Sequence, residues 1–103
     1  MNPMNPDGDA NCWLSCMTIA EGCPVTPDDV MDALAAENIE SRPIWNPMHR
    51  QPVFAECDFI QVNEGISVSE DIFNRGLCLP SDIKNTAEDM QTIINIVRKC
   101  FGR

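Results

Sequence analysis

TAEDMQTIINIVRKCF, residues 86–101, is the stretch that places a long helix at the end of this chain. Its apolar side chains recur at the spacing of one helix face: Met90, Ile93, Ile94, Val97 and Phe101. A stripe with this period is typical of an amphipathic helix that packs on a core. The residues Thr86-Ala87-Glu88-Asp89 open it.

Upstream, a second helix is predicted to begin at Thr26-Pro27-Asp28-Asp29. Threonine can cap a first turn, proline suits the first helical position, and two carboxylates favour the positive end of the helix dipole. Apolar residues again share one face, at Val30, Met31, Leu34 and Ala35. The helix should stop near Asn38, because asparagine tolerates a left-handed backbone.

Three apolar runs predict strands, at residues 11–19, 39–44 and 77–79. Pro43 limits the pairing of the second, which we therefore place at an edge or end of the sheet, and Pro80 stops the third. Between these two strands we expect a short helical turn near 53–57. A short helix should follow it, capped by Ser67 or Ser69 and ended by Gly76.

This order of elements predicts an α/β fold of the α+β sandwich type. It has a small, mostly antiparallel three-stranded sheet with helices packed on one face. Residues 1–10 contain two Asn-Pro steps and are expected to form a flexible N-terminal tail. Residues 11–103 then form one domain, which suits a length of 103 residues with 44% apolar and 22% charged side chains.

Charge and hydropathy argue against two classes of partner. Seven basic and 16 acidic residues give a net charge of −9, and phosphate backbones repel such a surface, so we expect no nucleic-acid partner. No run approaches the roughly 20 apolar residues of a membrane-spanning helix. The N-terminus has neither the basic region nor the apolar region of a secretory signal, which predicts a cytoplasmic protein.

The cysteines do not form a recognisable metal or disulfide motif. There is no CxxC pair and the chain has a single histidine, so no zinc or other metal site is predicted. In a reducing cytoplasm we expect free thiols, several of them buried as small apolar groups. A thiol redox protein is an alternative that rests on the cysteine count alone. The six are Cys12, Cys16, Cys23, Cys57, Cys78 and Cys100.

No residue is assigned a catalytic role from its local pattern. Cys16 or Cys57 is conceivable as a nucleophile beside His49, but no local signature supports the pairing. Lys84 and Lys99 lie in polar surroundings rather than in an apolar pocket, so neither reads as a Schiff-base lysine. Residues 45–52 combine large and polar groups, which favours a surface that binds a ligand.

Four blocks of the chain resemble the DegT/DnrJ-type sugar aminotransferases. They are NCWLSC (11–16), VTPDDV with ALAAENI (25–30 and 33–39), SRPIWNPMHRQPVF (41–54) and DIFNRGLCLPS (71–81). Because the blocks follow the family's order and cover the chain from about Asn11 to Phe101, the chain resembles the family's C-terminal small domain.

The resemblance implies a reaction and partners. These enzymes are pyridoxal-phosphate (PLP) dependent, of fold type I, and usually dimeric, so a homo-oligomer is implied. They move an amino group, commonly from glutamate, onto a nucleotide-linked keto-sugar for polysaccharide or glycan synthesis. The cofactor lysine lies in a large domain with no counterpart here. We therefore expect this chain to be inactive alone and to pair with the large PLP-binding domain.

The resemblance also implies three residues near the cofactor and the nucleotide-sugar substrate. Arg42 would clamp an anion, either a phosphate or the donor's carboxylate, because a guanidinium forks onto such groups. Trp45 would form an apolar wall, and His49 would make a polar contact to the substrate. The chain departs from the family at Asn46, where lysine is frequent, and at Arg50, where leucine is frequent.

A second hypothesis is a freestanding interaction or regulatory module that reuses the small-domain fold.

Under the first hypothesis, a small domain apart from its large domain should expose the apolar surface on which that large domain packs. We therefore expect self-association or modest stability in solution.

Overall fold

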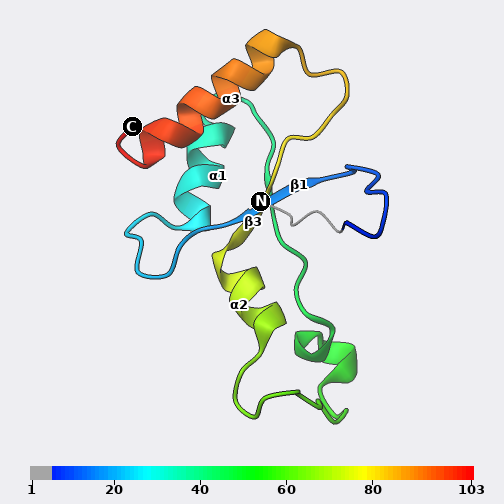
Figure 1. Cartoon of the computed structure of the whole chain (residues 1–103). Coiled ribbons are helices and arrows are strands. Elements are labelled where there is room, and N and C mark those ends of the chain that lie inside the picture. The colour runs from blue at the N-terminus through cyan, green and yellow to red at the C-terminus, as the bar shows by residue number, and fades with distance from the viewer. Residues whose placement is uncertain (1–5) are drawn as a thin grey trace.

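The computed structural model describes residues 6–103, so residues 1–5 of the expected tail lie outside the described range. Within that range the sheet has three strands in the order β1-β3-β2, with both pairs antiparallel, and three α-helices accompany it (Figure 1). The predicted small antiparallel α/β fold is confirmed. The elements are β1 (Ser15–Thr18), α1 (Pro27–Ala35), β2 (Arg42–Pro43), the 3-10 turns η1 (Met48–Arg50) and η2 (Pro52–Phe54), α2 (Val68–Arg75), β3 (Gly76–Leu79) and α3 (Ala87–Cys100).

Two of the helices begin in the same way, with a reciprocal cap. In α1 the Thr26 hydroxyl accepts a bond from the Asp29 amide (3.2 Å), and the Asp29 carboxylate accepts one from the Thr26 amide (2.8 Å). Thr86 and Asp89 repeat the arrangement at the start of α3. These bonds to threonine hold the pKa of both aspartates below the ordinary value. The predicted helix starts are confirmed, as is the left-handed Asn38 beyond α1 (φ 59°).

Thr86→Ala is expected to lower the free energy of unfolding by about 1 kcal/mol, because it leaves the Asp89 amide in the first turn of α3 without its hydroxyl acceptor. Urea denaturation followed by circular dichroism measures the change. Thr92→Ala is the matched control: this exposed threonine bonds only the Glu88 carbonyl, and its loss should stay within about 0.5 kcal/mol. Equal losses in the two variants would contradict a specific capping role.

The strands are shorter than the sequence suggests. β1 covers Ser15–Thr18 instead of 11–19, because its partner β3 offers only four residues before Pro80. β2 covers Arg42–Pro43 instead of 39–44, and Pro43 has no amide hydrogen to continue the ladder. β2 lies at the edge of the sheet, as predicted, and β3 lies at its centre.

The core lies between one face of the sheet and helices α1 and α3. Successive strand residues point to opposite faces, and Met17 and Leu77 share the face that packs on Val30 and Leu34 of α1 and Ile93 of α3. None of the described residues from 45 to 75 belongs to this core cluster. That segment, with η1, η2 and α2, extends away from α1 and α3 (Figure 1). We call it the arm.

Candidate functional site

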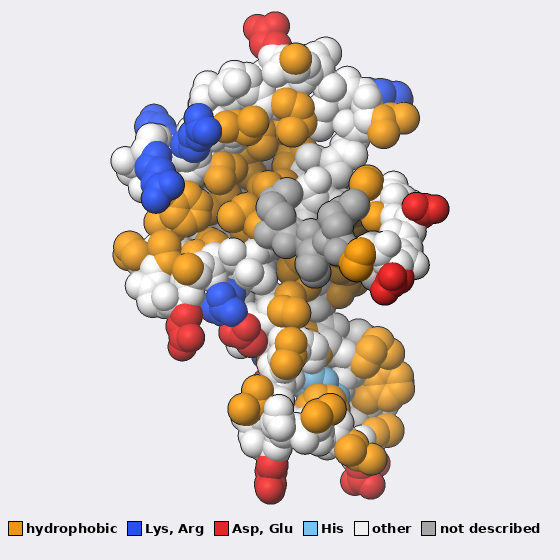
Figure 2. Space-filling view, viewed as in Figure 1, with side chains coloured by type: hydrophobic (Ala, Val, Ile, Leu, Met, Phe, Trp, Pro, Cys, Tyr) orange, Lys and Arg blue, Asp and Glu red, His pale blue; other side chains and the backbone are white. Residues whose placement is uncertain are grey.

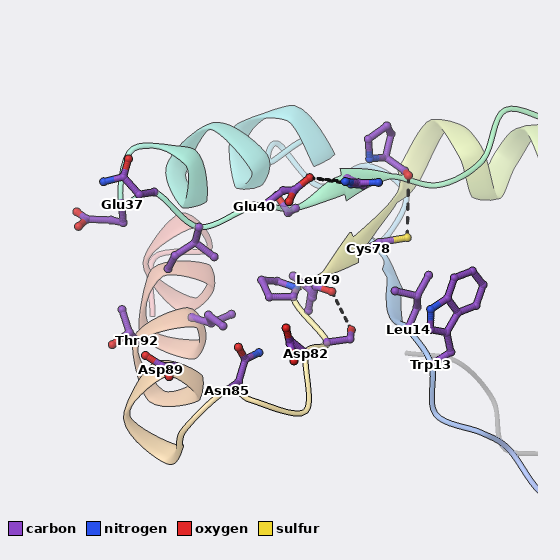
Figure 3. A pocket seen from close by; sticks show the side chains of 18 of the residues that line it. Trp13, Leu14, Glu37, Glu40, Cys78, Leu79, Asp82, Asn85, Asp89 and Thr92 are labelled. Atoms are coloured by element: carbon purple, nitrogen blue, oxygen red, sulfur yellow. Dashed lines mark hydrogen bonds and ion pairs between the residues drawn. The ribbon is translucent and has the colours of Figure 1, made fainter.

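A cavity of about 790 Å³ opens where the sheet ends (Figure 3). β3 stops at Leu79, and the chain then leaves the sheet as a loop toward α3, so the end of the central strand is left uncovered. The segment before β1, the loop between α1 and β2, and the first turns of α3 complete the wall. The lining residues are Trp13, Leu14, 37–43, Trp45, 78–82, Asn85, Asp89, Thr92 and Ile93.

The two tryptophans of the chain both line this cavity. The ring centroids of Trp13 and Trp45 lie 6.0 Å apart at 42°, and the residues are 68% and 61% exposed. Such a pair presents broad π-faces on which a planar ring can stack. Trp45 was expected at the site, whereas Trp13 was assigned to a strand. The NCWLSC block that contains Trp13 carries no local signal of a place in the cavity, because it reads as part of the strand predicted over residues 11–19.

Arg42 is the only basic side chain among the lining residues of this cavity in the described chain. Its Nε and Nη2 atoms donate to Glu40 Oε1 at 2.8 and 2.6 Å, and both side chains are about three-quarters exposed. Exposed ion pairs contribute little, about 0–1 kcal/mol, so an incoming phosphate or carboxylate can replace Glu40.

The remaining charge on the cavity wall is acidic, from Glu37, Glu40, Asp82 and Asp89. Asp82 accepts a bond from the Lys84 amide, and Asp89 accepts one from Thr86, so both carboxylates are engaged with backbone. An anion is therefore favoured only beside the Arg42 guanidinium.

His49 lies apart from Arg42 and Trp45. It does not line the large cavity but a smaller one of about 300 Å³ on the arm, with Met48, Phe54, Cys57, Asp58 and Phe59. Its ring stacks on Phe59 with the centroids 3.6 Å apart, and its Nε2 lies 2.7 Å from Glu70 Oε1 of α2. The structure thus brings two of the three expected site residues together and places the third elsewhere.

Three polar side chains form a row across the sheet. Cys78 of β3 pairs in register with Cys16 of β1 on one side and with Arg42 of β2 on the other. All three point to the face opposite the core, because Met17 and Leu77 occupy the other face. Burial, with a smaller contribution from the hydrogen bond to Cys16, raises the pKa of the Cys78 thiol to about 11. The sequence carried no signal for this row.

Comparison with known proteins decides the family. Residues 1–98 match the DegT/DnrJ/EryC1/StrS aminotransferase family. The chain belongs to this family. Among family relatives, it is 39% identical over 94 residues to the "Putative pyridoxal phosphate-dependent aminotransferase EpsN" of Bacillus subtilis (strain 168). It is 33% identical over 84 residues to the GDP-perosamine synthase of Caulobacter vibrioides (strain ATCC 19089 / CIP 103742 / CB 15).

The alignments with these two relatives cover most of this chain but only a small part of each relative. The two alignments take in 91% and 80% of the chain, yet only 24% and 21% of the respective relatives. The chain thus spans about a fifth to a quarter of the length of the curated relatives it matches.

The lysines of the chain lie outside both cavities described above. Enzymes hold this cofactor through a lysine Schiff base. Lys84 and Lys99 are the only lysines, both are exposed, and neither lines either cavity. Across residues 6–103 no group of three or more metal-ligating side chains occurs. In the same range no helix has the length and apolar character to cross a bilayer.

The arm carries a large exposed apolar surface. Besides Trp45, eight large apolar side chains of the arm are between 39% and 101% exposed. Hydrophobic side chains gather on the lower lobe in Figure 2, where Figure 1 shows the arm in the same view. Apolar side chains gathered on a protein surface commonly mark a place where another protein packs. The residues are Met48, Val53, Phe59, Ile60, Val62, Ile66, Val68 and Ile72.

Proposed function

We propose that residues 11–103 form the C-terminal small domain of a cytoplasmic, PLP-dependent nucleotide-sugar aminotransferase. The parent enzyme would move an amino group from a donor such as glutamate to a nucleotide-linked keto-sugar, for surface polysaccharide or glycan biosynthesis. Family membership over a small share of each relative's length supports this proposal. PLP, when bound to the large domain, supplies the chemistry of amino transfer.

The observation that carries the site is that Arg42 and the tryptophan pair line the same cavity. In this proposal the guanidinium exchanges Glu40 for a substrate phosphate or the donor's carboxylate. Trp45, together with Trp13, forms an apolar wall in this proposal. The planar base of the nucleotide stacks on this wall and displaces water from it. The chain thus binds and orients substrate while the large domain holds the cofactor.

For His49 we propose a positioning role. Its ring stacks on Phe59 and bonds Glu70, which ties the middle of the arm to α2. Arg50 belongs to the same 3-10 turn, and its Cζ lies 5.3 Å from the ring centroid of Phe73 in α2. This cation–π contact is a further link between the turn and α2. The apolar surface of the arm would then pack on the large domain or on a second copy in a homo-oligomer.

A nucleotide-sugar titration tests the proposed site. Adding UDP-glucose or GDP-mannose to the 103-residue chain should shift both tryptophan indole Nε1–H signals in NMR spectra. Arg42→Ala should weaken binding about 10- to 150-fold, because it removes a charge-assisted hydrogen bond worth about 1.5–3 kcal/mol.

Arg98→Ala provides the control, since Arg98 carries the same charge but lines neither cavity. It should bind as the unaltered chain does. If millimolar nucleotide sugar moves neither indole signal, or if both arginine variants bind equally, the proposed site is wrong although the family assignment stands.

A further inference from the structure

Two thiols face each other across the β1–β3 ladder. Cys16 and Cys78 are register partners, and their Sγ atoms lie 3.4 Å apart. Three residues further on, the Ile19 amide donates to the Arg75 carbonyl at 2.8 Å and marks a hydrogen-bonded pair. Since such pairs alternate along antiparallel strands, Cys16 and Cys78 form a non-hydrogen-bonded pair, in which side chains approach most closely.

This kind of pair suits a disulfide. Its Cα atoms lie about 4.5 Å apart, within the span of about 4.4–6.8 Å that disulfides bridge. The two sulfurs are therefore close enough to join after small side-chain rotations, without separating the strands. The two thiols belong to residues 62 positions apart in sequence, so their joining would close a long loop.

We propose that Cys16 and Cys78 form a redox-sensitive pair that closes into a cross-strand disulfide by exchange with a small disulfide of the glutathione class. Neither the family's reaction nor its cofactor calls for this modification. It also does not depend on the function proposed above, because it uses only the sheet and its two thiols.

The exchange takes place in two steps. The more exposed thiol, Cys16, loses its proton and attacks one sulfur of the oxidant, whose other half leaves as a thiol. Cys78 then loses its proton and attacks the Cys16 sulfur of this mixed disulfide, and the second half of the oxidant leaves. Two protein thiols become one disulfide, and one oxidant disulfide becomes two thiols.

The burial of Cys78 should limit the rate of the second step. Cys78 is 6% exposed, and a thiol with a pKa of about 11 is almost wholly protonated near neutrality. Ring closure should therefore accelerate as the pH rises from 7 toward 11, because the thiolate fraction of Cys78 grows about tenfold per pH unit over most of that range.

The bond would affect the cavity directly. Cys78 lines the cavity and is the register partner of Arg42, so the disulfide would tie β1 to the strand that supports the proposed anion contact (Figure 3). Because a long closed loop restricts the unfolded chain, the oxidised protein should also unfold at a higher temperature than the reduced protein.

Peptide mapping tests the proposal on the full chain. The reduced protein is incubated with defined ratios of oxidised to reduced glutathione, quenched in acid, alkylated and digested with trypsin. Residues 76–84 form a tryptic peptide with Cys78 as its only cysteine. We expect this peptide to be linked to the N-terminal peptide that contains Cys16, with a mass loss of two hydrogens that dithiothreitol reverses.

Serine variants identify the partner. The N-terminal peptide also holds Cys12 and Cys23, so Cys12→Ser and Cys23→Ser should each retain the link and thereby assign it to Cys16 even if Cys16→Ser folds poorly. Cys16→Ser should lose it. Loss of the link in either of the first two variants, its persistence in Cys16→Ser, or oxidation that yields only glutathione adducts would overturn the proposal.

Discussion

Leu34→Ala is expected to lower the free energy of unfolding by about 2–5 kcal/mol. Leu34 of α1 is fully buried and packs in one cluster with Leu77 of β3 and Ile93 of α3. Alanine would leave a void where both helices and the sheet meet. A chain of this size is stable by only about 5–15 kcal/mol, so the loss is a large share of the total. Urea denaturation monitored by circular dichroism measures it.

Ile83→Ala is the matched control, because isoleucine has the same number of carbon atoms as leucine and Ile83 is 99% exposed. Its removal should change the free energy of unfolding by no more than about 0.5 kcal/mol. Similar losses in the two variants would mean that the core does not lie between α1, α3 and the sheet.

Gly76→Ala is the second large effect that we expect, a loss of about 1–3 kcal/mol from overpacking. A Cβ at this position would lie less than 3.0 Å from the Ile72 carbonyl oxygen and from Cγ1 of Ile44. The Gly76 backbone is extended (φ −108°, ψ 153°), so alanine could adopt it without strain. The loss would therefore report the close approach of neighbouring atoms.

A double-mutant cycle separates the two contacts. In an Ile44→Ala background the Ile44 side chain no longer obstructs the new Cβ, so the penalty of Gly76→Ala should shrink but not vanish, because the Ile72 carbonyl remains. A neutral or stabilising Gly76→Ala in the unaltered chain would show that the strand and α2 do not approach each other this closely.

Local features of the sequence predicted local features of the fold. Thr26 and Thr86 each form a reciprocal cap with an aspartate three residues later in the sequence. The helix starts could therefore be identified without tertiary information. Strand lengths could not, because the length of β1 depends on how many residues β3 offers as partners. The apolar run before Ser15 continues past the end of the ladder, and there Trp13 takes part in the cavity instead.

In the candidate site, too, features that depend on neighbouring residues could be predicted and features that depend on distant residues could not. Arg42 and Trp45 lie three residues apart, and both line the same cavity. His49 follows closely in sequence, yet its surroundings are set by Glu70, 21 residues away. The pairing of Cys16 with Cys78 is equally remote, and no spacing rule reveals a register across 62 residues.

The junction between α2 and β3 contains no loop: α2 ends at Arg75 and β3 begins at Gly76. Arg75 is also bonded to Ile19, the residue that follows β1, since its side chain donates to the Ile19 carbonyl and its own carbonyl accepts from the Ile19 amide. The arm and the central strand are thus joined without an intervening loop. A rotation of the arm would be transmitted directly to β3, where Cys78 lies between Cys16 and Arg42.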